Sequence, residues 1–154
     1  MRPTAPVATV IDVQVDDEGW VRALPAAEQL ALEAATAAAG GDGELAIRLT
    51  GDGEMRALNA RYRGQDRPTN VLAFPDGGGA RLGDIALALG VCRREASDQG
   101  KALADHLRHL VVHGVLHLRG YDHQSDAEAA RMEDEERRLL AKMNIADPYD
   151  ERTG

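Results

Sequence analysis

Hydrophobic and polar residues follow two rhythms along the chain, one typical of strands and one typical of helices. Alternation with a period of two, rich in β-branched residues, predicts strands, whereas apolar residues three and four apart predict helices. The expected strands span 7–15, 44–49, 68–74 and 82–89. The expected helices span 26–39, 52–63, a segment from about 91, 103–118 and a last segment after Ser125. Four strands and about five helices predict one compact α/β domain of mixed (α+β) type over residues 1–154, with a flexible tail after about 148.

Several residues mark where these elements begin and end. Asp52 is expected to cap the helix that follows it, and Gly64 to end that helix. Residues 16–19 are polar and are expected to form a turn. Ser125 and Glu128 match the S-x-x-E pattern of a capping box. The inward face of the last helix is expected to carry Met132, Leu139, Leu140 and Met143.

The composition of the chain bears on the cellular compartment of the protein. No apolar run approaches the length of a membrane span, and residues 1–6 lack the apolar stretch of a signal peptide. The single cysteine, Cys92, cannot form an internal disulfide and is expected to be a small buried filler. Together these features favour the cytoplasm.

Charge is distributed unevenly. The net charge of −8 argues against a generic nucleic-acid binder, and DNA is not an expected partner. Residues 1–50 and 122–154 each carry a net −5, whereas residues 51–121 carry a net +2. A run of this kind is either a solvated helix face or a surface for an anionic partner. The basic residues of interest are Arg56, Arg61, Arg63 and Arg67.

The most informative segment, residues 109–123, reads H-L-V-V-H-G-V-L-H-L-R-G-Y-D-H. In a helix, His113 and His117 share one face about one turn apart. Gly120 can take a left-handed conformation and end the helix, so that His123 could turn back toward them. Three neutral imidazoles form a zinc-type ligand set, with the fourth tetrahedral position left for water.

Two features qualify this interpretation. His106 and His109 lie on the same helix and are rival ligands or supporting neighbours, and the helix-then-turn geometry favours the other three histidines. The spacing matches the metzincin pattern H-E-x-x-H-x-x-G-x-x-H except that Gly114 replaces the glutamate. A zinc peptidase needs that carboxylate as a general base, so a peptidase is disfavoured.

The second informative segment, residues 58–75, reads L-N-A-R-Y-R-G-Q-D-R-P-T-N-V-L-A-F-P. It combines a helix end, a basic turn and a strand. Arg61, Arg63 and Arg67 beside Tyr62 could grip phosphate, because guanidinium groups match phosphate oxygens. An Arg-rich helix end is also ordinary in itself, since cations are favourable at the negative end of the helix dipole.

These two segments, with L-G-D-I-A-L at 82–87, resemble the YbeY family of bacterial endoribonucleases and ribosomal RNA maturation factors. The resemblance implies a single α/β domain that binds one zinc ion per chain through His113, His117 and His123. It implies functional roles for Arg63 and His113 in single-strand-specific cleavage, in maturation of the small-subunit rRNA 3′ end and in ribosome quality control. The implied partners are ribosomal RNA, the small ribosomal subunit, ribosomal proteins and a ribosome-associated GTPase, with no membrane.

Three classes of function stay open at this point. The chain is a zinc-dependent endoribonuclease, a ribosome-assembly factor with a structural zinc, or a metal-dependent hydrolase of another substrate. Asp122 either holds a ligand imidazole or is a surface turn residue. Asp84 either lines the site or belongs to a strand-end turn. No residue suggests itself as the general base.

Overall fold

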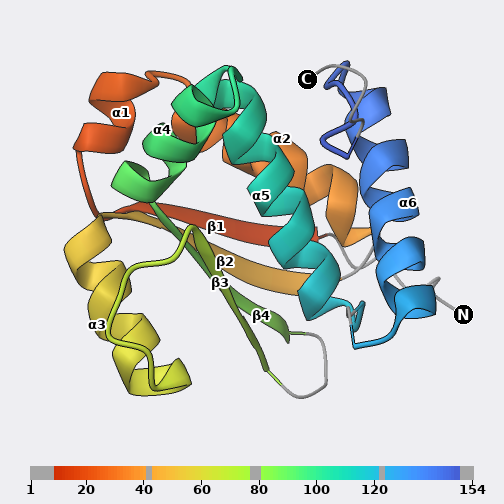
Figure 1. Ribbon diagram of the computed structural model, residues 1–154, viewed down its shortest axis with the longest axis horizontal. Helices are drawn as coiled ribbons and strands as arrows, with labels where there is room; N and C mark the ends of the chain where they lie inside the picture. The colour runs from red at the N-terminus through yellow and green to blue at the C-terminus, as the bar shows by residue number, and fades with distance from the viewer. Residues whose placement is uncertain (1–8, 41–42, 77–80, 122–123, 150–154) are drawn as a thin grey trace, which may run out of the picture.

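The computed structural model describes residues 9–40, 43–76, 81–121 and 124–149 (Figure 1). The strands are β1 (Thr9–Val15), β2 (Gly43–Thr50), β3 (Val71–Pro75) and β4 (Arg81–Ala88). The helices are α1 (Gly19–Ala23), α2 (Ala27–Ala39), α3 (Asp52–Arg63), α4 (Leu89–Asp98), α5 (Leu103–Leu118) and α6 (Asp126–Lys142). The predicted mixed α/β class and the four strands are confirmed, and the described residues contain six helices where about five were expected.

The sheet has the order β1-β2-β4-β3. Strands β1, β2 and β4 are parallel, and β3 runs antiparallel to β4 at one edge. Parallel neighbours need helical crossovers, and these place helices on both faces of the sheet. Consequently β4 is buried on both sides over its second half, as its nearly continuous apolar sequence predicted.

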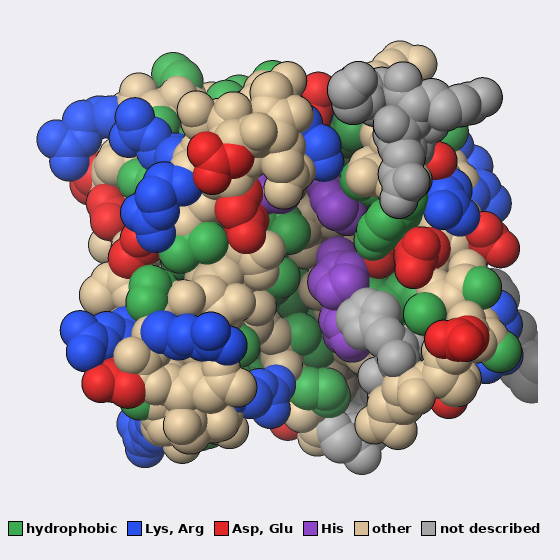
Figure 2. All heavy atoms as spheres, in the orientation of Figure 1, with side chains coloured by type: hydrophobic (Ala, Val, Ile, Leu, Met, Phe, Trp, Pro, Cys, Tyr) green, Lys and Arg blue, Asp and Glu red, His purple; other side chains and the backbone are tan. Residues whose placement is uncertain are grey.

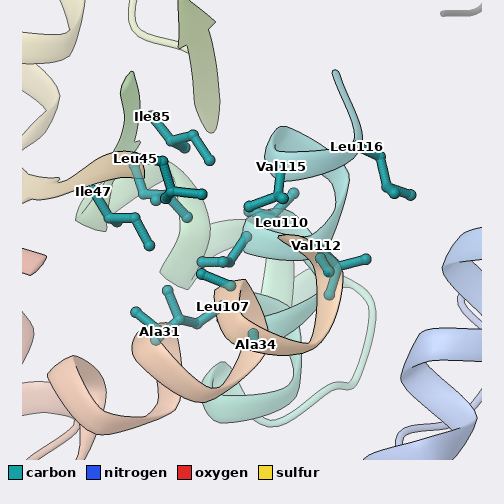
Figure 3. Close-up of a cluster of buried hydrophobic side chains, with 14 of the residues drawn as sticks. Ala31, Ala34, Leu45, Ile47, Ile85, Leu107, Leu110, Val112, Val115 and Leu116 are labelled. Carbon is teal, nitrogen blue, oxygen red and sulfur yellow. The ribbon is translucent and has the colours of Figure 1, made fainter. Parts of the chain in front are cut away.

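Helices α2 and α5 cover one face of the sheet, α3 lies against the other face, and α6 packs on α5 (Figure 1). Figure 3 shows Leu107 and Val115 of α5 facing the strand residues Leu45, Ile47 and Ile85. A smaller cluster between α3 and the sheet contains Met55, Leu72, Ala86 and Ala88. The sheet edge formed by β3 therefore separates an α5 side from an α3 side.

Helix α1 is the element that the sequence pattern missed, because five residues are too few to show a helical period. Its anchor is Trp20, which is fully buried and donates a hydrogen bond from Nε1 to the Thr50 carbonyl at 2.8 Å. The predicted turn at 16–19 therefore leads directly into a helix.

The prediction that Asp52 caps its own helix is wrong. Gly51 is the N-cap of α3, and Asp52 is its first residue. The Asp52 carboxylate instead accepts hydrogen bonds from the Val91 backbone N–H at 3.0 Å and from Arg94 at 3.1 Å. It thus satisfies a free N–H in the first turn of α4, which lies beside it in space.

The C-terminal end of α5 and the N-terminal start of α6 agree with the prediction. Gly120 has a φ of +96° just after α5, where the Tyr121 N–H bonds back to the Leu116 carbonyl at 3.0 Å. Ser125 accepts a hydrogen bond from the Glu128 N–H at 3.1 Å and so caps α6. In the described part of the chain, no helix is long and apolar enough to cross a membrane.

Candidate metal centre and cleft

A stripe of histidines runs along the side of α5 that does not face the sheet. His106, His109, His113 and His117 recur every three or four residues, so their rings lie in a row along one side of the helix and meet edge to face. Figure 2 shows the histidine side chains in purple along a hollow on this face of the molecule. The helix thus packs into the core with one side and presents imidazoles with the other.

A buried carboxylate from α6 organises the middle of this stripe. Glu136 is completely buried, and its Oε1 lies 2.7 Å from His113 Nδ1. Its Oε2 lies 3.0 Å from His109 Nε2 and accepts a hydrogen bond from the Tyr149 hydroxyl at 2.6 Å. Burial raises the pKa of Glu136, but the hydrogen bonds from His109, His113 and Tyr149 outweigh it and lower the pKa to about 2. Glu136 is therefore an ionised acceptor at neutral pH.

Because an ionised carboxylate only accepts hydrogen bonds, each imidazole nitrogen facing Glu136 carries the proton. In neutral His113 this places the proton on Nδ1 and makes Nε2 the nitrogen that carries the lone pair. His113 Nε2 lies 3.2 Å from His117 Nε2. Two nitrogens bound to one tetrahedral zinc lie about 3.3 Å apart, given Zn–N bonds of about 2.0–2.1 Å. The distance between the two nitrogens therefore matches that expected for two ligands of one zinc ion.

The remaining predicted ligand, His123, lies outside the described residues, as does Asp122. Among the described residues no cluster of three or more His, Cys, Asp or Glu side chains is arranged to hold a metal. The ligand set His113, His117 and His123 therefore stays a prediction, supported by the first two nitrogens and by Glu136. A carboxylate behind a metal-binding histidine is a common arrangement that fixes the tautomer and raises ligand basicity.

His109 is placed differently from His113. Its Nε2 is engaged by Glu136, and its Nδ1 is buried without a hydrogen-bond partner in the described part of the chain. His106, one turn earlier, lies 2.9 Å from Glu95 through Nε2 and is 3% exposed. Burial lowers the pKa of His106, although Glu95 opposes this. Neither side chain lines the cleft described next, which supports their assignment as neighbours.

A cleft of about 460 Å³ opens between the end of α5 and the edge strand β3. One wall carries His113 and His117. The opposite wall carries Arg63, whose exposed guanidinium donates a hydrogen bond from Nη2 to the Ala73 carbonyl at 2.9 Å. Two residues that the sequence singled out for chemistry, Arg63 and His113, thus face the same cavity.

Gly114 shows why this cleft lacks the metzincin glutamate. It is buried, and a Cβ at this position would lie 3.1 Å from side-chain atoms of Ile85 on β4. A side chain at 114 would therefore press on Ile85, which would have to shift by a few tenths of an ångström. Among its described lining residues, the cleft contains no carboxylate. The disfavoured peptidase interpretation gains no support from the geometry.

The predicted basic residues differ in whether an acidic partner compensates their charge. Arg56 forms a two-point ion pair with Asp66, at 2.7 and 3.0 Å, and its charge is compensated. Arg61, Arg63 and Arg67 form no ion pair with any described carboxylate.

Two other candidate residues lie away from the histidine cleft. Asp84 pairs with Arg81 at 2.5 Å and lines a hollow on the α3 side, so it does not line the histidine cleft. Buried Cys92, whose pKa is raised by its burial, is the filler that was expected.

Sequence reasoning missed Glu136 and Tyr149. Glu136 falls on the predicted inward stripe of α6, four residues after Met132 and three before Leu139, which are both buried. An acidic residue on an apolar stripe was the available signal, but the acidic run around it concealed the pattern. Tyr149, at the start of the predicted flexible tail, is bonded to Glu136, while residues 150–154 lie outside the described part.

The profile of the family described as endoribonuclease YbeY matches residues 11–144. The chain belongs to this family. A relative from Rhodopseudomonas palustris strain BisB5, named endoribonuclease YbeY, is 51% identical over 157 residues, covering 90% of this chain and 80% of its own. A Maricaulis maris relative of the same name is 50% identical, covering 90% and 91%. The solution structure of a Thermotoga maritima protein has 25% identity and a TM-score of 0.58, covering 92% of this chain and 99% of its own.

Proposed function

We propose that this YbeY family member is a zinc-dependent, single-strand-specific endoribonuclease in the cytoplasm. It would mature the 3′ end of small-subunit ribosomal RNA and take part in ribosome quality control. The relatives at about half identity carry the name endoribonuclease, which supports cleavage of RNA. The observation that carries the proposal is the placement of Arg63 on one wall of a cleft whose other wall presents His113 and His117.

The chain's residues divide the work as follows. His113 and His117, with the predicted third ligand His123, would hold one zinc ion. Glu136 holds His113 in the tautomer whose Nε2 is unprotonated, so that no proton must leave this ring before it binds metal. A bound zinc would supply a Lewis acid beside the scissile phosphodiester. Arg63 would stabilise the negative charge that develops at phosphorus, because it is a fixed cation on the opposite wall.

The two alternatives fit the cleft less well. A structural zinc needs four protein ligands, and the described lining of the cleft adds no cysteine, aspartate or glutamate to its histidines. A hydrolase of peptides would need a carboxylate beside the metal, and the same lining offers none. The uncompensated Arg61, Arg63 and Arg67 beside the cleft favour a polyanionic substrate instead. Ribosomal RNA, the small subunit, its proteins and an associated GTPase remain the partners that the family resemblance suggests.

The test combines zinc content with cleavage of an end-labelled single-stranded RNA. Wild-type protein should cleave when zinc is bound, lose activity after chelation and regain it when zinc is restored. His117→Ala should lose both zinc and cleavage. Arg93→Ala, an exposed arginine on α4 away from the cleft, serves as the control and should behave as wild type. Full activity in the chelated protein or in His117→Ala would contradict the proposal.

A further inference from the structure

Two of the few aromatic residues of this chain meet on its surface. The sequence has one Phe, one Trp and three Tyr, so aromatic rings are scarce. Tyr62, at the end of α3, is 51% exposed, and its ring packs edge-on against Phe74 of β3 with centroids 5.3 Å apart. The exposed part of this ring, supported from the side by Phe74, offers a flat surface on which a ligand can stack.

The charges around this pair favour an anionic partner. The guanidinium of Arg61 lies 5.2 Å from the centre of the Tyr62 ring, and that of Arg63 lies 5.6 Å from the centre of Phe74. Neither arginine pairs with a described carboxylate.

The hollow beside the rings adds no free charge of its own. Its volume is about 350 Å³, and its lining includes Arg48 and Asp84. Both of these charges are already engaged, Arg48 with Asp16 at 2.6 Å and Asp84 with Arg81. The charge available to a ligand here therefore comes from Arg61 and Arg63.

The aromatic pair adjoins the candidate catalytic cleft. Successive side chains of a strand point to opposite faces. Ala73 accordingly lines the histidine cleft, whereas Phe74 belongs to the hollow on the α3 side. Arg63 reaches over the edge between them, since it lines the cleft, bonds the Ala73 carbonyl and lies over the Phe74 ring. If an RNA chain placed a phosphate at Arg63, the neighbouring base would lie across the edge strand β3, near Tyr62.

We propose that Tyr62, supported by Phe74 and flanked by Arg61, is a stacking platform for an unpaired base of the RNA substrate. Aromatic rings beside a basic groove bind single strands in this way, because every base has a flat apolar face. A base inside a duplex is already stacked and cannot lie on the ring. The platform therefore supplies a physical basis for single-strand selectivity. The proposal rests on the proposed function, since the occupant is RNA.

The test measures binding apart from cleavage. In a His117→Ala background, the affinity for a short single-stranded oligoadenylate is measured with Tyr62, Tyr62→Phe and Tyr62→Ala. One lost stack should weaken binding about tenfold in Tyr62→Ala, whereas Tyr62→Phe should retain affinity. Affinity for a duplex of the same length should not change. Val10→Ala removes a second large exposed hydrophobic side chain of the described residues, which is 55% exposed on β1, and should have no effect.

A second measurement reports the contact directly. Tyr62→Trp places an exposed indole on the platform, and its fluorescence should be quenched when oligoadenylate stacks on it. Trp20 is fully buried and should contribute an unchanged background. Three results would overturn the platform: unchanged affinity in Tyr62→Ala, unquenched emission from the Tyr62→Trp protein at saturating RNA, or no RNA binding at all. If Tyr62 governs binding but the zinc-loaded enzyme does not cut RNA, the platform stands and the proposed nuclease function fails.

Discussion

Two carboxylates meet the histidines of α5, and they differ in what they leave open. Glu95 on α4 lies 2.9 Å from His106 Nε2 and accepts a hydrogen bond from Asn70 Nδ2 at 3.0 Å. Glu136 on α6 contacts His109 through Nε2 but His113 through Nδ1. Only the last of these contacts leaves an imidazole Nε2 on a cleft wall. The carboxylates therefore engage the Nε2 atoms of His106 and His109, whereas in His113 the carboxylate engages Nδ1 and Nε2 faces the cleft.

The two carboxylates also differ in exposure. The Glu136 side chain is fully buried, whereas that of Glu95 is 33% exposed. Buried charge is tolerated only where donors surround it. Glu136 has three such donors, two from α5 and one from Tyr149, and it ties α5, α6 and Tyr149 together. Water can replace lost partners at Glu95 but not at Glu136.

The largest expected effect is on zinc binding. Purified wild type should bind about one zinc per chain, in line with a three-histidine site. His113→Ala, His117→Ala and His123→Ala should each abolish stoichiometric zinc binding, because each removes a predicted ligand. His109→Ala should weaken binding by no more than about tenfold, as expected for a residue behind the ligands. Metal analysis after dialysis is the measurement. Zinc loss from His109→Ala that equals the loss from His113→Ala, with His123→Ala harmless, would show that the ligand set is wrong.

The next largest effect is the difference in the free energy of unfolding between removing Glu136 and removing Glu95. Glu136→Ala leaves the half-buried side chains of His109, His113 and Tyr149 without their shared acceptor and should lower the free energy of unfolding by about 3 kcal/mol. Glu95→Ala should cost less, about 1–2 kcal/mol, because Asn70 and the partly exposed carboxylate site can be hydrated, although the His106 ring is buried.

The matched control for this comparison is another acidic residue of α6. The Asp134 side chain is 74% exposed, so Asp134→Ala should change the free energy of unfolding by no more than about 0.5 kcal/mol. Denaturant unfolding in the presence of a chelator measures all three variants. Equal losses at Glu95 and Glu136 would remove the distinction between the two carboxylates.

The smallest effect concerns pH. Burial lowers the pKa of His106 below its unfolded value of about 6.5, so the folded state favours the neutral ring. This stability is present above the unfolded pKa and is lost as pH falls through the folded pKa. The unfolding free energy of metal-free wild type should therefore fall more steeply than that of His106→Gln as pH drops below about 6.5. Parallel pH profiles for the two proteins would contradict a neutral His106.

The sequence predicted the helices and their ends better than it predicted which side chains contact one another across the fold. The span of α5, its end at Gly120 and the cap at Ser125 follow from local rules, and all three were confirmed. Glu136 could not be assigned, because its partners lie 13 to 27 residues away and only the fold brings them together. The prediction that Asp52 caps its own helix failed for the same reason, since its hydrogen-bond partner Val91 lies on another helix.

The candidate site shows the same division. The spacing of His113 and His117 is a local property of a helix, and the structure places their Nε2 atoms 3.2 Å apart. That Arg63 faces them follows from the antiparallel edge strand β3, which brings the end of α3 and the end of α5 to one cleft. The family resemblance pointed to Arg63, whereas spacing alone did not.

The central claim is that Arg63 acts on the substrate held at the histidine cleft and contributes little to the stability of the fold. The most direct measurement is the cleavage rate of single-stranded RNA by Arg63→Ala, with zinc content and thermal melting on the same preparation. Arg63 is exposed, so its removal should change stability by no more than about 0.5 kcal/mol and leave zinc in place. The rate should fall by about a hundredfold or more, and Arg63→Lys should recover only part of it. Cleavage at the wild-type rate by folded, zinc-loaded Arg63→Ala would contradict the account.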